Sequence, residues 1–138
     1  MNWDLVRLFP DFGCVVLVYI VQLTIYPSFL YYSQSALDNW HSKYTRRISI
    51  VVMPLMLSQL FLNTYILFDH FSSLNLISFG LILGIWIITF FQAVPLHNSL
   101  NIKESSQENI RKLIRVNGWR CFFWTLAMML NVWSYLQS

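Results

Sequence analysis

Two histidines, His41 and His97, are the side chains in this sequence best suited to acid–base or metal chemistry. An imidazole changes protonation near neutral pH, and its neutral form binds haem or a metal ion. The two are therefore our candidate catalytic groups, and haem or another metal is the cofactor that such a pair would hold. No dedicated metal site is predicted, because the sequence has no His-x-x-x-His pair. The alternative is that both histidines anchor helices at a membrane interface and bind nothing.

Buried amides are the second group of candidates. At ~1.5 Å per residue, Gln22, Gln59 and Asn131 come out at one depth, roughly 15–17 Å from the predicted cytoplasmic ends of their helices. We expect them to meet in the core of a helix bundle. They either hold helices together, at about 1–2 kcal/mol or less per pair, or form the polar floor of a ligand pocket.

Arginines supply the third group, because Arg47 and Arg120 would suit an anionic partner such as a carboxylate or a lipid phosphate. The alternative is loose contact with lipid head groups. Two amide side chains, Gln92 and Asn98, lie near the end of an apolar run, and Pro95 is expected to end the helix that this run forms. The complete set of expected ligand-binding residues is Gln22, Tyr26, Tyr44, Arg47, Gln59, Gln92, Asn98, Asn117, Arg120 and Asn131.

Four apolar stretches must position these side chains, at about residues 13–32, 48–68, 76–96 and 119–136. The sequence is 57% hydrophobic and only 11% charged, and each stretch is long enough for a helix to cross about 30 Å of hydrocarbon. No carboxylate is expected inside a span. The predicted fold class is all-α: one transmembrane domain over residues 1–138, built as an integral membrane antiparallel four-helix bundle.

Short amphipathic segments are expected between the spans. Met1–Phe12 is predicted to lie at the interface and to end at Pro10. Ser35 is predicted to cap a cytoplasmic helix that enters the membrane near Ile48. A capping box at Ser105–Glu108 is predicted to start a second amphipathic helix that leads into the last span.

Charge placement predicts the orientation. One of the nine Lys and Arg residues precedes the first span and the other eight lie around the loops after spans 1 and 3. The positive-inside rule puts those two loops in the cytoplasm and both termini outside, in a bacterial cytoplasmic (inner) membrane. No cleavable signal is expected, because the first apolar run has full span length. Cys14 and Cys121 are predicted near opposite faces and unbridged.

A series of short motifs runs along the chain: Gln22, Tyr26-Pro27, Trp40-His41, Arg47, Pro54-Leu55-Met56, Gln92 to His97, and Asn117 with Arg120. In these motifs the chain resembles a family of small, uncharacterised bacterial four-span membrane proteins over nearly its whole length. Gly118 and Cys121 stand where that family has tryptophan and threonine. The chain is also distantly similar to anthrone-oxygenase-like membrane proteins, which implies a four-helix bundle and a lipophilic substrate.

These observations favour a small membrane protein with a cytoplasm-facing polar pocket for a lipophilic or amphipathic molecule. One alternative is a membrane oxidoreductase or isomerase that acts on a hydrophobic substrate through His41 and His97. The other is a purely structural or assembly subunit. Membrane lipids are the expected partners, together with a larger membrane complex or a homo-oligomer. Nucleic acid is excluded, because no basic face with exposed stacking aromatics is predicted.

Overall fold

Almost every residue is helical in the computed structural model, which describes residues 2–101 and 107–137. No strand occurs within those two ranges, so the all-α prediction is confirmed. The elements are α1 (Trp3–Ile20), the π-helical turn η1 (Val21–Ile25), α2 (Tyr26–Ser28), the 3₁₀ turn η2 (Phe29–Tyr31), α3 (Gln34–Asp69), α4 (Ser73–Ile88), the π-helical turn η3 (Thr89–Ala93), α5 (Val94–Asn101) and α6 (Gln107–Gln137).

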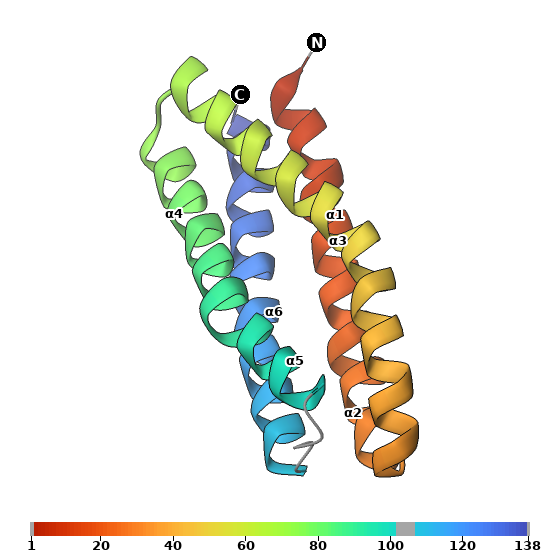
Figure 1. Ribbon diagram of the computed structural model, residues 1–138. Helices are drawn as coiled ribbons and strands as arrows, with labels where there is room; N and C mark the ends of the chain where they lie inside the picture. The colour runs from red at the N-terminus through yellow and green to blue at the C-terminus, as the bar shows by residue number, and fades with distance from the viewer. Residues whose placement is uncertain (1, 102–106, 138) are drawn as a thin grey trace.

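These elements form long helical segments that lie side by side (Figure 1). Both termini lie at the same end as the α3–α4 turn, whereas α2 and the start of α6 lie at the other end. Helix α6 packs against both α1 and α4. Within the described residues, three segments are long and apolar enough to cross a membrane: Trp3–Tyr31, Gln34–Asp69 and Ser73–Leu100. Helix α6 is not one of them, since Arg120 and Asn131 lower its hydropathy.

The first helix corrects two predictions. It begins at Trp3 and continues through Pro10, so no separate interfacial segment ends there. It also buries the Asp11 carboxylate, which was predicted to precede the first span, inside the continuous apolar segment Trp3–Tyr31. Asn2 starts the helix by accepting a hydrogen bond from the Leu5 amide at 3.2 Å. Pro10 removes one backbone hydrogen bond from the helix interior, and the buried polar contacts of Asp11, described below, help to offset that loss.

Helices α3 and α6 are each continuous. As predicted, the helix that precedes Ile48 continues into the second apolar stretch, and it forms the first part of α3. Its cap is Ser33 instead of Ser35, because the Ser33 hydroxyl accepts a hydrogen bond from the Ala36 amide at 3.4 Å. The second amphipathic segment is likewise the first part of α6, although Ser105 and Ser106 of the predicted capping box lie outside the described residues.

Two π-helical turns shape the middle of the fold. In η1 the Tyr26 amide bonds to the Val21 carbonyl, and in η3 the Val94 amide bonds to the Thr89 carbonyl. Each turn ends two residues before a proline, Pro27 or Pro95. A proline has no N–H and its ring clashes with the carbonyl four residues earlier, so a widened turn accommodates it. The chain directions of α2 and α5 therefore depend on these turns.

The two cysteines are unpaired, as predicted. They do not lie near opposite faces, however, because Cys14 and Cys121 belong to one apolar cluster with Met56, Ile85 and Trp124. The prediction assumed that the first helix starts at Gly13. Since α1 starts at Trp3, Cys14 lies in the interior of that helix and not at its first residues.

Candidate functional site

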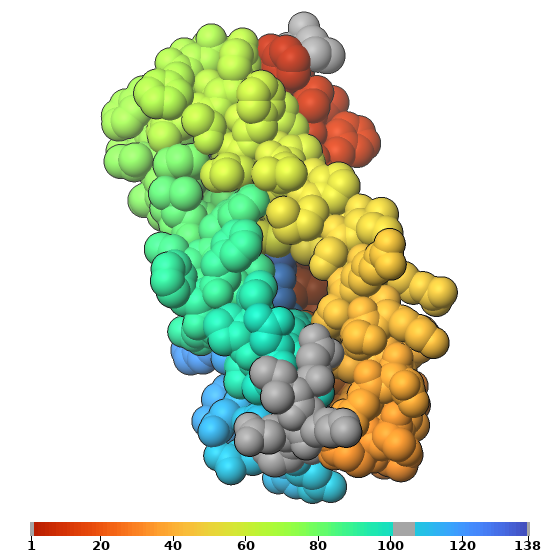
Figure 2. Space-filling view, viewed as in Figure 1, coloured from red at the N-terminus to blue at the C-terminus, as the bar shows by residue number. Residues whose placement is uncertain are grey.

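A cavity of about 380 Å³ is lined by residues of both π-helical turns, Val21 of η1 and Thr89, Phe90 and Ala93 of η3. Helices α1 and α6 form its floor, and α3, η3 and α5 form its walls. Figure 2 shows the opening on the side of the molecule, as a hollow between α3 and the η3–α5 segment with atoms of α1 and α6 at its base. Six of the predicted residues line the cavity: Tyr26, Tyr44, His97, Asn98, Asn117 and Arg120.

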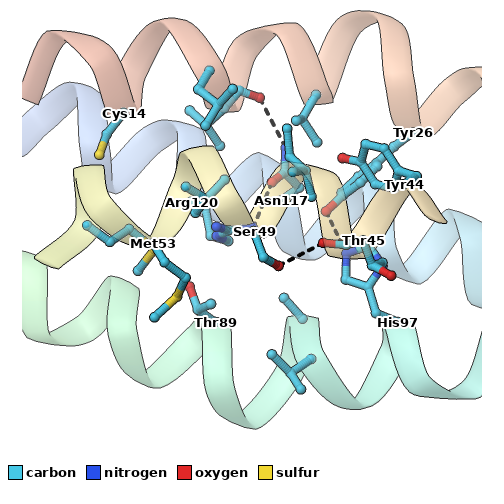
Figure 3. Close-up of a pocket in the computed structure, with 18 of the residues that line it drawn as sticks. Cys14, Tyr26, Tyr44, Thr45, Ser49, Met53, Thr89, His97, Asn117 and Arg120 are labelled. Carbon is cyan, nitrogen blue, oxygen red and sulfur yellow. Dashed lines mark hydrogen bonds between the residues drawn. The ribbon is translucent and has the colours of Figure 1, made fainter. Parts of the chain in front are cut away.

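The side chains of His41 and His97 lie next to each other. His41 Nε2 lies 2.8 Å from His97 Nδ1, and His97 Nε2 lies 2.8 Å from the Tyr26 hydroxyl (Figure 3). His97 and Tyr26 line the cavity, while His41 is fully buried behind them. The three side chains form a hydrogen-bonded chain that ends at the cavity, and this geometry allows a proton to move along it.

A shared metal ion does not fit between the two imidazoles as they stand. Ligand nitrogens at ~2.0–2.1 Å from a tetrahedral ion stand further apart than two atoms joined by a hydrogen bond. Across residues 2–101 and 107–137, no group of three or more His, Cys, Asp and Glu side chains is placed to hold a metal. The two imidazoles are instead hydrogen-bonded to each other, and this bond orients the His97 ring toward Tyr26.

Arg120 is the charged group on the cavity floor. Its side chain is only 8% exposed; Nη1 donates to the Asn117 Oδ1 atom at 3.2 Å, and the guanidinium lies 4.9 Å from the Trp124 ring centroid. Its Nε atom is buried with no hydrogen-bond partner. In the described part of the chain it makes no ion pair with a carboxylate. Such a group is costly to bury unless an anion joins it.

Side-chain amides hold the two residues that contact Arg120, Asn117 and Trp124. Asn117 Nδ2 donates to Gln22 Oε1 at 2.9 Å and to the Val18 carbonyl at 3.3 Å. The Trp124 indole N–H donates to Gln59 Oε1 at 2.9 Å. Gln22 and Gln59 therefore act beneath the cavity floor and do not line it.

Two predicted site residues lie elsewhere. Arg47 is exposed and does not line the cavity, whereas its neighbour Arg46 does. Successive residues on a helix point about 100° apart, so the two arginines cannot face the same cavity. Gln92 is also exposed, on the outer surface beside Pro95. Gln92 lies within η3. A π-helical turn contains one extra residue, so side chains before the end of the turn point in a different direction, relative to His97, than they would in a regular α-helix.

A second polar cluster, formed by Arg7, Asp11, Gln59, Asn63, Asn75 and Asn131, lies outside the cavity. Asp11 accepts hydrogen bonds of 2.7 Å from both Gln59 Nε2 and Asn131 Nδ2, and Asn131 also donates to Asn63 at 3.1 Å. Gln59 and Asn131 thus meet as predicted, but through a carboxylate, and Gln22 is not with them.

Sequence reasoning missed Arg7 and Asp11, both of which are fully buried. Arg7 bonds to Asn75 Oδ1 at 2.9 Å and to Asp4 at 2.8 Å. A signal was present, because Arg7, Asp11, Cys14 and Val18 follow the spacing of one helix face, and that face is the buried one. Gln59 connects this polar cluster to the cavity floor, because its amide bonds to Asp11 and also to Trp124 beside Arg120.

No family model, no curated protein and no solved structure matches this chain.

Proposed function

We propose that this chain is an integral membrane protein, an antiparallel four-helix bundle whose lateral cavity binds a lipophilic or amphipathic molecule taken from the bilayer. Three apolar helices of sufficient length support the membrane location. We assign α6 as the fourth span because it packs against α1 and α4 and buries Asn117, Arg120 and Asn131 on its inner face. Polar groups inside a membrane are expected to face the bundle interior in this way.

The orientation follows from the charges that flank the helices. The first part of α3, whose sequence includes Arg46 and Arg47, and the basic first turns of α6 lie toward the end of the molecule that also holds α2 (Figure 1). We place that end in the cytoplasm of a bacterial cell, at the inner membrane, with both termini on the opposite side. The cavity then lies in the half of the bundle nearer the cytoplasm.

The observation that carries the proposal is the side opening of the cavity. A soluble ligand would enter from an end of the bundle, whereas an opening between two spans faces lipid. The apolar rim residues Met53, Phe90 and Val94 are 38–49% exposed. Arg46 and Asn98 are exposed on the same rim. A molecule with both apolar and polar parts matches this lining.

A blocking variant tests the proposal. Ser49 is exposed at the opening, and its hydroxyl bonds to the Thr45 carbonyl of its own helix. Ser49→Trp should obstruct the opening without disturbing the core. Ser58 is the matched control, since it is also exposed on α3, bonds to the Leu55 carbonyl and lies away from the cavity.

Mass spectrometry of molecules extracted from the purified protein provides the measurement. Wild type and Ser58→Trp should retain the same lipophilic compound in near-stoichiometric amount, and Ser49→Trp should lose most of it. Equal retention by all three proteins would refute ligand binding in the cavity and favour a purely structural subunit.

A second candidate function rests on the Tyr26–His97–His41 chain. Because the Tyr26 hydroxyl and His97 face the cavity, they are placed to exchange a proton with a bound substrate, as an isomerase would require. His41 would act as a positioning residue through His97. Tyr26→Phe should then retain the bound compound but stop its conversion. If wild type leaves the extracted compound chemically unchanged after incubation, this candidate is excluded.

A further inference from the structure

Resting on the proposed binding function, we infer that the ligand is a single-chain amphiphile with an acidic head group, whose negative charge pairs with Arg120. The charges of the cavity lining, the positions of its polar and apolar parts and the cavity volume support this assignment.

The charged side chains among the described residues that line the cavity are all positive. Arg46 and Arg120 both line the cavity, and the described lining residues include no aspartate or glutamate. The titratable groups that interact electrostatically with the Arg120 guanidinium include Tyr26, Tyr44, His97, Cys14 and Cys121, and none of these is a carboxylate. The Asp11 carboxylate lies in the other cluster and is already bonded to two amides. Among residues 2–101 and 107–137, therefore, no carboxylate balances the charge of Arg120.

The neighbours of Arg120 fix it in place rather than neutralise it. Asn117 and Trp124 are neutral, and each is held in turn by a glutamine, Gln22 or Gln59. An arginine positioned in this way, with its Nε atom unpartnered, resembles a preorganised anion site more than a group directed at solvent. Its 8% exposure also separates it from bulk lipid head groups.

The lining divides into two parts on either side of Arg120 (Figure 3). Tyr26, Tyr44 and His97 lie to one side of it, and Cys14, Met53 and Thr89 lie to the other. An acidic head group at Arg120 would have hydrogen-bonding side chains on the first side. Its chain would pass Met53 and leave through the side opening into lipid.

The volume favours one chain. At about 380 Å³ the cavity is near the lower end of the range for small-molecule sites, which is roughly 300–1,000 Å³. It would admit a head group with part of one acyl chain. A phospholipid with two chains and a large head group would exceed it.

Three probes that share one chain separate head-group charge from chain binding: dodecanoate, dodecyl phosphate and dodecanol. Binding is measured for delipidated protein in nanodiscs of zwitterionic lipid at alkaline pH, where both acids are ionised. The variants are Arg120→Gln, Arg120→Lys and, as a matched control, Arg47→Gln, since Arg47 is an exposed arginine outside the cavity. Thermal unfolding identifies any variant that fails to fold.

We expect wild type and Arg47→Gln to bind an acidic probe at least about tenfold more tightly than dodecanol, where a factor of ten corresponds to about 1.4 kcal/mol. Arg120→Gln should remove this preference and leave dodecanol binding unchanged, and Arg120→Lys should restore part of it. The acid that binds better, carboxylate or phosphate, identifies the head group. When part of the zwitterionic lipid is replaced by anionic phosphatidylglycerol, binding of the acidic probes should not weaken.

Each contrary result has a separate meaning. If dodecanol and the acids bind equally to wild type, the acidic head group is refuted while the lipophilic cavity stands. If phosphatidylglycerol displaces the probes, the occupant is a two-chain phospholipid and the single-chain assignment is wrong. If none of the three probes binds, the proposed cavity function itself fails.

Discussion

Removal of the Asp11 carboxylate should destabilise the helical fold more than any comparable surface change. The side chain is fully buried and accepts two hydrogen bonds of 2.7 Å, from Gln59 on α3 and Asn131 on α6. In Asp11→Ala both amide donors would lose their acceptor. The carboxylate therefore joins three helices, and its loss affects all three interfaces at once.

Two reference values bound the size of the effect. A buried donor left without a partner costs about 1–3 kcal/mol, which gives about 2–6 kcal/mol for two donors. Interhelical hydrogen bonds inside membranes average only ~0.6 kcal/mol, because the unfolded state also finds partners. We therefore expect Asp11→Ala to reduce the free energy of unfolding by about 2–4 kcal/mol.

The nearly isosteric change Asp11→Asn should cost much less, at most about 1 kcal/mol. One oxygen would remain to accept from Gln59. The new amide N–H₂ group could donate to the Asn131 Oδ1 atom, which is buried without a hydrogen-bond partner, once the Asn131 amide rotates. Arg7 would keep its ion pair with Asp4 at 2.8 Å.

Reversible unfolding in mixed detergent micelles measures both variants, and Asp69→Ala is the control. Asp69 is an exposed aspartate paired with His70 at 3.1 Å, so its removal should change the free energy of unfolding by less than about 0.5 kcal/mol. A loss below 0.5 kcal/mol for Asp11→Ala, or equal losses for the alanine and asparagine variants, would show that the carboxylate does not organise the bundle.

Three further predictions follow from single contacts. Tyr26→Phe removes the hydroxyl that bonds to His97 at 2.8 Å and should lower stability by about 0.5–1.5 kcal/mol, measured by thermal unfolding against Tyr31→Phe, a 90% exposed tyrosine. Trp124→Phe loses the bond to Gln59 and weakens the contact with Arg120, so it should reduce the acid-over-alcohol preference by less than Arg120→Gln does; an unchanged preference would mean that Trp124 does not position the arginine. The hydrogen bond and charge of Lys112 hold the pKa of Glu108 below its ordinary value, so Lys112→Gln should raise that pKa in an NMR titration. The corresponding stabilisation of α6 is present above the pKa of the unfolded carboxyl group and is lost as the pH falls through the lowered value.

The sequence supported the helical architecture well because long apolar stretches leave little alternative to helices. It also identified His41, His97, Tyr26 and Arg120, since hydrogen-bonding groups near the ends of apolar helices tend to face other helices. The structure brings these four side chains around one cavity or directly behind it.

Where the sequence reasoning failed, the cause was local geometry or an unrecognised partner. Gln92 shares a segment with His97, but a π-helical turn rotates it outward. Asp11 was predicted to lie in an interfacial segment before the first span, because Pro10 was expected to end that segment. Its amide partners lie 48 and 120 residues away in the chain, and no local pattern reveals them.

By itself, then, the sequence determined that the chain is helical, that its polar residues are few, and which of them carry useful chemistry. Those properties follow from composition and from spacing along one helix. Only the tertiary structure decided that Arg47 faces outward while Arg120 faces a cavity whose described lining residues include no carboxylate, and that Asp11 is bonded by α3 and α6. The physical reason is that charge compensation and burial depend on distances between helices, and these are set by how the helices pack and by where the π-helical turns rotate them.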